Sequence, residues 1–95
     1  MNAITSTIQK GSDELFINKT TDGKNNICGN RISELRKKLN ISQRELADRL
    51  QISGLDIDKN AIQRIEAGKR FVTDIELVYI TETFNVSLDY LLLDK

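Results

Sequence analysis

Residues 42–70, SQRELADRLQISGLDIDKNAIQRIEAGKR, decide the fold of this 95-residue chain. The pattern of apolar side chains predicts two short amphipathic helices, at about residues 43–50 and 59–67, joined by a turn. Ser42 followed three residues later by Glu45 has the spacing of a capping box, in which two side chains satisfy backbone amides at a helix start. The first helix therefore has a defined beginning, and its inward face is apolar, with Leu46, Ala47 and Leu50.

The second helix of this stretch has two contrasting faces. At about 100° per residue, Ala61, Ile62 and Ile65 share one arc, which can pack on a core. The opposite arc offers an ammonium, two amides and a guanidinium, and these groups match the hydrogen-bonding edges of bases in the major groove of DNA. An ordinary solvated helix face is also polar and often basic, so this helix alone leaves both interpretations open. The side chains expected to face bases are Lys59, Asn60, Gln63 and Arg64.

Three motifs in and after this stretch resemble the lambda-repressor/Cro-type, or XRE-type, helix-turn-helix family. They are Ser-Gln-x-x-Leu-Ala at residues 42–47, Ile-x-x-Ile-Glu-x-Gly-Lys-Arg at residues 62–70 and Val-Ser-x-Asp-x-Leu at residues 86–91. The resemblance covers about residues 29–93. It implies an all-α, five-helix, lambda-repressor-like domain that binds specific sequences of double-stranded DNA as a transcriptional regulator, with a repressor favoured. The helix at about 59–67 would then enter the major groove.

The same resemblance implies roles for residues around the two helices. The amide of Gln43 and the backbone N–H groups of its helix start suit a phosphate, and basic residues flank both helices. In the family, an Arg at the position of Arg36 pairs with a Glu at the position of Glu66, so these two are expected to be a structural pair. The residues expected to face phosphates are Gln43, Arg44, Lys69 and Arg70.

The chain departs from the family in the turn between the two helices. The expected turn, residues 51–58, is several residues longer than the family's tight turn, and Gln51 stands where the family usually has Gly. This extended turn puts the pose of the following helix in question. Its three apolar side chains are expected to tuck into the core, which would order it: Ile52, Leu55 and Ile57.

Local signals predict the remaining helices at about residues 30–40, 74–84 and 88–93. Asn40, Gly68 and Asn85 are expected to end helices, because these residues tolerate left-handed backbone. The expected N-terminal caps are Asp56 or Asp58, then Thr73 in a second capping box with Glu76, then Ser87. Phe71 is expected in the core, and so are Leu77, Val78, Ile80 and Phe84.

The chain is expected to divide into a flexible N-terminal arm at residues 1–28 and the helix-turn-helix domain at residues 29–95. The first part is rich in polar residues and is interrupted by the apolar cluster at residues 15–17. The arm either reaches along DNA through its lysines or is a passive tail, and both interpretations stay open. Its lysines are Lys10, Lys19 and Lys24.

Composition narrows the class of protein. There is no His, the commonest general base, and Cys28 is the single Cys, so neither an enzyme, a metal site nor a structural disulfide is indicated. No glycine-rich phosphate loop indicates a nucleotide, so no cofactor is expected. The absence of a signal peptide and of a membrane-spanning run predicts a cytoplasmic protein.

Charge is balanced overall but unevenly distributed. Residues 29–71 hold ten basic and six acidic side chains, for a net charge of +4, whereas residues 72–95 carry a net charge of −4. A basic end that coincides with the expected reading helix favours a phosphate-facing surface, although such asymmetry also arises by chance in a small protein.

Two alternatives concern partners. The zero net charge and the long turn leave room for a protein-interaction module, such as an antitoxin or a regulator that binds a protein. The run Leu91-Leu92-Leu93 cannot point to one core at helical spacing, so at least one of its side chains should be exposed. That exposure fits a homodimer through the C-terminal helix, and it equally fits a frayed end.

Overall fold

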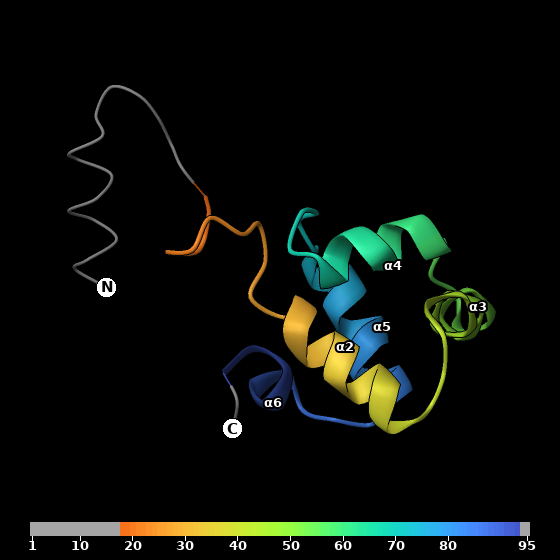
Figure 1. Cartoon of the computed structure of the whole chain (residues 1–95). Coiled ribbons are helices and arrows are strands. Elements are labelled where there is room, and N and C mark those ends of the chain that lie inside the picture. The colour runs from red at the N-terminus through yellow and green to blue at the C-terminus, as the bar shows by residue number, and fades with distance from the viewer. Residues whose placement is uncertain (1–17, 94–95) are drawn as a thin grey trace.

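The computed structural model describes residues 18–93, and every regular element in this range is a helix. The helices are α2 (Gly29–Lys38), α3 (Gln43–Ser53), α4 (Lys59–Glu66), α5 (Asp74–Phe84) and α6 (Leu88–Leu93), shown in Figure 1. This arrangement confirms the expected all-α class and its five helices within the described range. The apolar cluster at residues 15–17 and the other residues before 18 lie outside that range.

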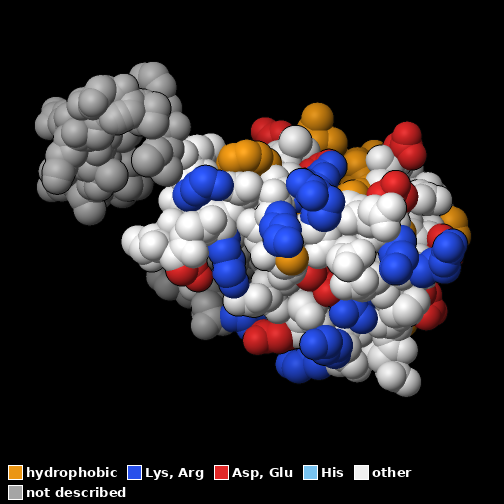
Figure 2. Space-filling view, turned by 45° about the horizontal axis from the view of Figure 1, so that its top comes forward, with side chains coloured by type: hydrophobic (Ala, Val, Ile, Leu, Met, Phe, Trp, Pro, Cys, Tyr) orange, Lys and Arg blue, Asp and Glu red, His pale blue; other side chains and the backbone are white. Residues whose placement is uncertain are grey.

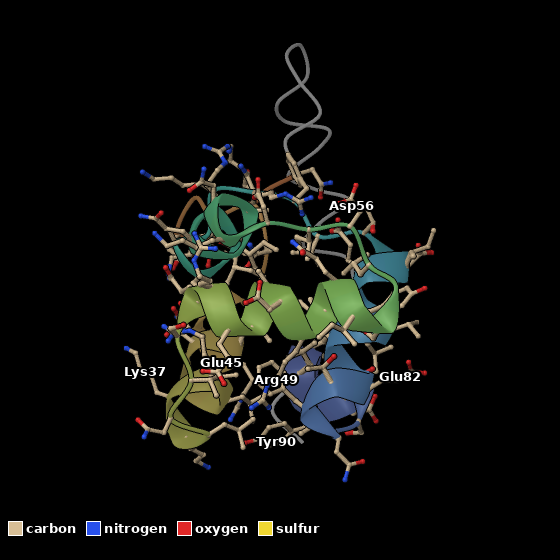
Figure 3. The ribbon with its side chains drawn as sticks, turned by 90° about the vertical axis from the view of Figure 1, so that its right-hand side faces the viewer. Lys37, Glu45, Arg49, Asp56, Glu82 and Tyr90 are labelled. Carbon is tan, nitrogen blue, oxygen red and sulfur yellow. The ribbon has the colours of Figure 1, made fainter. Side chains whose placement is uncertain are left out.

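All five helices contribute side chains to one core. Each has at least one apolar residue that is almost completely shielded from solvent, as the inward stripes of the sequence predict. Figure 3 shows α3 crossing in front of the other helices, with α4 on one side of it and α2 on the other. Full burial of each such side chain stabilises the fold by about 1.5–3 kcal/mol. The central ones are Ile32, Leu46, Leu50, Ile62, Ile65, Ile80 and Leu91.

Side-chain caps begin α3, α4, α5 and α6, each by accepting a hydrogen bond from a backbone amide three residues ahead. Ser42 and Asp58 cap α3 and α4 at 3.0 and 2.8 Å. Thr73 and Glu76 form the complete capping box that was predicted for α5, and Ser87 caps α6. Of the capping box predicted at Ser42, the hydrogen bond from the Glu45 amide forms. The Glu45 carboxylate, which would complete the box, pairs with Arg49 at 3.5 Å.

Four helices end in the same way. After each of α2 to α5, one residue has left-handed backbone, and the amide of the next residue donates to the carbonyl five positions back. This Schellman pattern satisfies carbonyls that have no partner within the helix. The predicted helix ends at Asn40, Gly68 and Asn85 are therefore confirmed. The left-handed residues, with φ of 59°, 117°, 78° and 56°, are Asn40, Gly54, Gly68 and Asn85.

The expected turn at residues 51–58 is wrong in its boundaries, because α3 continues through Ser53 and ends at Gly54. The helix places Ile52 on its outer face, about 200° around from the buried Leu50, so Ile52 is 86% exposed rather than tucked in. Leu55 and Ile57 do pack on the core. The Gln51 amide donates to the Ile57 carbonyl at 2.7 Å, which orders the shorter connection.

Two expected core residues near the start of α5 are not in the core. Phe71, in the link before α5, is 52% exposed, and its neighbour Val72 packs inward instead. Val78 is exposed to the same extent, because it lies about 200° around α5 from the buried Ile80. Together with Ile27 and Ile75, these side chains leave apolar surface around α5.

Candidate nucleic-acid interface

The outer face of α4 is polar, exposed and continuous with the turn that follows it. All four residues expected to face bases are exposed, while Ile62 and Ile65 on the opposite face are buried. Three of the four line a shallow groove together with residues from the end of the helix. Figure 2 shows Lys and Arg side chains spread over the face that carries this helix. The groove is lined by Asn60, Gln63, Arg64, Ala67 and Lys69.

A second groove lies where α3 meets α4. Arg44 and Gln51 of α3 line it together with Lys59 and Asn60 of α4. The basic side chains of Arg44 and Lys59 therefore belong to one surface. Ala47, which is 2% exposed, lies between them, and its small side chain allows the two helices to pack closely. Two carboxylates, Asp48 and Asp58, also line this groove and reduce its positive charge.

The Arg36 and Glu66 side chains form a two-pronged ion pair between α2 and α4. Arg36 Nε donates to Glu66 at 2.7 Å and Nη2 at 3.0 Å, and the two side chains are only 12% and 8% exposed. Hydrogen bonding to Glu66 raises the pKa of Arg36 above its usual value. The Gln43 amide donates to the same carboxylate at 3.0 Å, so Gln43 ties the start of α3 to this pair.

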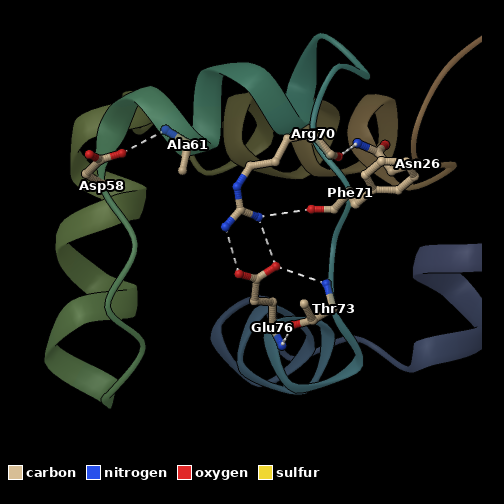
Figure 4. Close-up of polar contacts among 7 residues, drawn as sticks. All are labelled: Asn26, Asp58, Ala61, Arg70, Phe71, Thr73 and Glu76. Carbon is tan, nitrogen blue, oxygen red and sulfur yellow. Dashed lines mark hydrogen bonds and ion pairs between the residues drawn. The ribbon is translucent and has the colours of Figure 1, made fainter.

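Arg70 lies in a second two-pronged ion pair, between the link after α4 and the start of α5. Its guanidinium donates to both carboxylate oxygens of Glu76 at 2.9 Å and to the Phe71 carbonyl at 3.1 Å (Figure 4). The hydrogen bond from Arg70 holds the pKa of Glu76 below its ordinary value. Gln43 and Arg70 thus make intramolecular contacts, whereas Arg44 and Lys69 are exposed.

Sequence reasoning missed two residues that organise this surface, Asn25 and Asn26. Their side chains donate to backbone carbonyls at the end of α4 and in the link after it. These residues belong to the segment expected to be part of a flexible arm. Local sequence gives no signal for such contacts, because the partners are about forty positions away and become neighbours only in the folded chain.

Other kinds of site have no support in the described part of the chain. Residues 18–93 contain no group of three or more His, Cys, Asp or Glu placed to hold a metal ion. Within the same residues, no helix is both long enough and apolar enough to span a membrane. Cys28 is buried, and burial raises the pKa of its thiol to about 11, which keeps it protonated near neutral pH.

Comparison with solved structures supports the architecture. The P22 c2 repressor protein, in a crystal structure with synthetic operator 9T and Tl+, superposes with a TM-score of 0.63 at 28% identity, over 73% of this chain and 97% of that one. The restriction-modification controller protein C.AhdI from Aeromonas hydrophila gives a TM-score of 0.58 at 24% identity, over 66% of this chain and 84% of that one. The second likeness shows the fold alone. A search of curated proteins found no match.

The family comparison matches residues 29–95 to the helix-turn-helix domain. These residues include all five described helices, both grooves and the Arg36–Glu66 pair. The chain therefore belongs to the helix-turn-helix domain family of non-enzymatic, DNA-binding proteins.

Proposed function

We propose that this chain binds a specific sequence of double-stranded DNA as a transcriptional repressor, with α4 in the major groove. The observation that carries the proposal is the composition of the outer face of α4. It presents two amides, an ammonium and a guanidinium to solvent on a helix whose opposite face is buried. Such groups discriminate base edges in the major groove. The base-facing residues in this proposal are Lys59, Asn60, Gln63 and Arg64.

The phosphate contacts would flank α4 on both sides. Arg44 on α3 and Lys69 after α4 are both exposed. Arg44 lines the groove at the start of α4 and Lys69 lines the groove along its later residues, and basic side chains beside a reading helix suit phosphate contacts. Gln43 and Arg70 would support these anchors, because their polar groups already bind Glu66 and Glu76. In that role Gln43 fixes the start of α3, and Arg70 fixes the link that carries Lys69.

The regulatory role rests on similarity. The structure of the P22 c2 repressor was solved in complex with a synthetic operator. The match to this chain has 28% identity and covers 97% of the P22 c2 repressor chain in that structure. We propose that two copies of this chain bind one operator, with their α4 helices in successive major-groove turns about 34 Å apart. A palindromic site is the expected signature.

The first test is a selection from random double-stranded DNA, followed by binding of the best sequence at several salt concentrations. We expect an enriched palindrome, and an affinity that falls steeply with salt, by a slope of about 0.9 for each phosphate neutralised. No enrichment, combined with weak binding only at low salt, would contradict the proposal.

The second test is Arg64→Ala. We expect its affinity for the selected site to fall by about 1–3 kcal/mol and its preference to relax at one base position. Arg49→Ala is the matched control, because Arg49 lies on the side of α3 away from α4 (Figure 3) and, among residues 18–93, its ion pair is with the exposed Glu45. Equal affinities of the two variants, with both proteins folded, would remove Arg64 from the base-facing set.

A specific observation favours a second candidate, a protein partner such as a toxin or another regulator. A cavity of about 370 Å³ has a polar part of its lining, formed by residues 18–20 and 24–26, and an apolar part that includes Ile27, Phe71, Leu77 and Leu92. Ile27 and Phe71 are exposed, and exposed apolar side chains that lie together are typical of a protein interface. Binding there would respond weakly to salt, in contrast to DNA binding. A pull-down becomes the next experiment if the DNA selection fails.

A further inference from the structure

Residues 19–26 form a strap that runs beside the carbonyl end of α4, as Figure 1 shows. The Asn25 backbone amide donates to the Gly68 carbonyl at 2.8 Å. Its side-chain amide donates to the Lys69 carbonyl at 2.9 Å. Lys19 fixes this side chain from the other side, with Nζ donating to Asn25 Oδ1 at 2.6 Å. The strap therefore holds the backbone of the residues that carry the exposed Lys69 side chain.

Asn26 connects three segments through one side chain. Its Nδ2 donates to the carbonyls of Ile65, at 3.1 Å, and Arg70, at 2.8 Å, the second of which appears in Figure 4. Its Oδ1 accepts from the Gly29 amide at 2.8 Å, at the start of α2. The last carbonyls of a helix lack intrahelical partners, so the strap supplies donors where α4 and its following turn need them.

The close packing of this region leaves little freedom in the position of the strap. A Cβ added to Gly29 would lie 2.2 Å from the Ile65 carbonyl oxygen, so the start of α2 presses on the end of α4. The strap also closes on itself, because the Thr20 amide donates to the Lys24 carbonyl at 2.8 Å and the Lys24 amide donates to Thr20 Oγ1 at 2.9 Å. The turn at residues 20–24 is thus preformed.

Lys24 is the residue of the strap that lies against Gly68, next to the proposed DNA surface. Its side-chain stem lies against Gly68, where a Cβ would come within 2.7 Å of Lys24 Cδ. Lys24 is therefore adjacent to Lys69, the residue after Gly68. Among residues 18–93, the Lys24 ammonium makes no ion pair or side-chain hydrogen bond. A hydrogen bond from Thr20 lowers the pKa of the Asp22 carboxylate of the same turn, and the charge of Lys24 helps to lower it. A cation held on a fixed turn beside a second cation suits a contact with the DNA backbone.

We propose that the strap is part of the DNA interface, with Lys24 as a further phosphate contact and with Asn25 and Asn26 as positioning residues for Lys69. This inference rests on the proposed DNA binding. It places a phosphate contact outside the two helices of the helix-turn-helix, on residues brought there by contacts across the chain. An anchored lysine loses less conformational freedom on binding than one on a loose tail, so it contributes more to affinity.

The test measures the affinity of the full chain for its selected duplex at several salt concentrations, for Lys24→Ala and for Arg49→Ala. Both variants remove one positive charge. We expect Lys24→Ala to lower the salt slope by about 0.9, as loss of one phosphate contact requires, and Arg49→Ala to keep the wild-type slope. Equal slopes for wild type and Lys24→Ala would overturn the contact. A wild-type chain that binds no duplex would instead overturn the proposed function together with the strap's role.

Asn26→Ser tests positioning independently. Serine retains an oxygen near the Gly29 amide and removes the amide donors to the Ile65 and Arg70 carbonyls. We expect affinity at 25 °C to fall by about fivefold or more in a variant that circular dichroism shows to be folded, because ordering the turn again costs free energy. Hydrogen exchange at the Asn25 amide should also become faster. A folded variant with wild-type affinity would overturn the positioning role, since loss of stability alone leaves the affinity of folded molecules unchanged.

Discussion

At the scale of single residues, two largely buried carboxylates, Glu66 and Glu76, hold together the segments that carry the polar surface. Glu66 accepts hydrogen bonds from both Arg36 and Gln43, and so links α2, α3 and α4 at one point. Glu76 accepts hydrogen bonds from Arg70 and from the Thr73 amide, and so connects the segment after α4 to the start of α5. Each carboxylate fixes a basic or polar residue of the interface by occupying its donors.

Glu66→Ala should lower the free energy of unfolding by about 3 kcal/mol, because it leaves the nearly buried Arg36 guanidinium without its partner. Glu45→Ala is the matched control. Its pair with Arg49 is exposed and spaced i, i+4, so its loss should cost about 0.3–0.5 kcal/mol. Urea unfolding of both variants measures the difference. Similar losses would show that the Arg36–Glu66 pair contributes no more than a surface pair.

Glu76 should make stability depend on acidity. Its pKa in the folded chain lies below the ordinary value of 4.5, chiefly through the hydrogen bond from Arg70. The resulting stabilisation is fully present above the ordinary pKa and is lost as pH falls through the folded pKa. Thermal unfolding between pH 6 and pH 3 should therefore show a steeper decline for wild type than for Glu76→Gln. Parallel curves for the two proteins would contradict this expectation.

At the scale of elements, α4 has only eight residues, and both of its ends are fixed by specific groups. Asp58 accepts from the Ala61 amide at the start, and Gly68 turns the chain at the end. A helix of this length is marginal on its own, so its caps and its buried face together hold the polar face in place.

Asp58→Ala should lower the free energy of unfolding by about 0.5–2 kcal/mol through loss of this cap. Asp58→Asn keeps a side-chain oxygen and removes the charge, so it should stay close to wild type in stability. Chemical denaturation of the three proteins separates capping from charge. If Asp58→Asn lost as much stability as Asp58→Ala, charge rather than the cap would be responsible.

At the scale of the whole molecule, most of the exposed large apolar side chains lie on the link after α4, on α5 and on α6, and the others are Ile27, Leu39 and Ile52. Most of the lysines and arginines are spread over α2, α3, α4 and the turn after α4. A protein that used the polar face of α4 for DNA would keep the apolar side chains of α5 and α6 available for another copy. Leu93, at the end of α6, is 57% exposed, in accord with the prediction that one leucine of the last helix is exposed.

Leu93→Ser should weaken self-association if the chain forms a homodimer through α6, one of the two interpretations that the sequence left open. Leu39→Ser is the matched control, because Leu39 is exposed to a similar extent, 49%, at the end of α2. Sedimentation velocity over a range of concentrations should show a larger monomer fraction for Leu93→Ser alone. If both variants behave like wild type, the contact lies elsewhere, for instance around Phe71 and Ile75.

The sequence by itself determined the helices, because their signals are local. Amphipathic spacing, capping residues and left-handed Asn or Gly act within a few positions, so the starts of α3 to α6 and the ends of α2, α4 and α5 could be read directly. The polar face of α4 could be read in the same way. The predicted end of α3 is too early, because the resemblance puts the family's turn glycine at the position of Gln51, whereas the left-handed cap in this chain is Gly54.

Only the tertiary structure decided which polar groups remain free on that surface. Gln43 and Arg70 are residue types that suit phosphate anchors, and carboxylates 23 and six positions away occupy their donors. Asn25 and Asn26 lie in a polar segment of the kind that is typical of loose chain. Their side-chain amides nevertheless donate to carbonyls about forty positions away and so hold the end of α4. Such contacts depend on close approach in three dimensions, and residue type and spacing along the chain do not encode that approach.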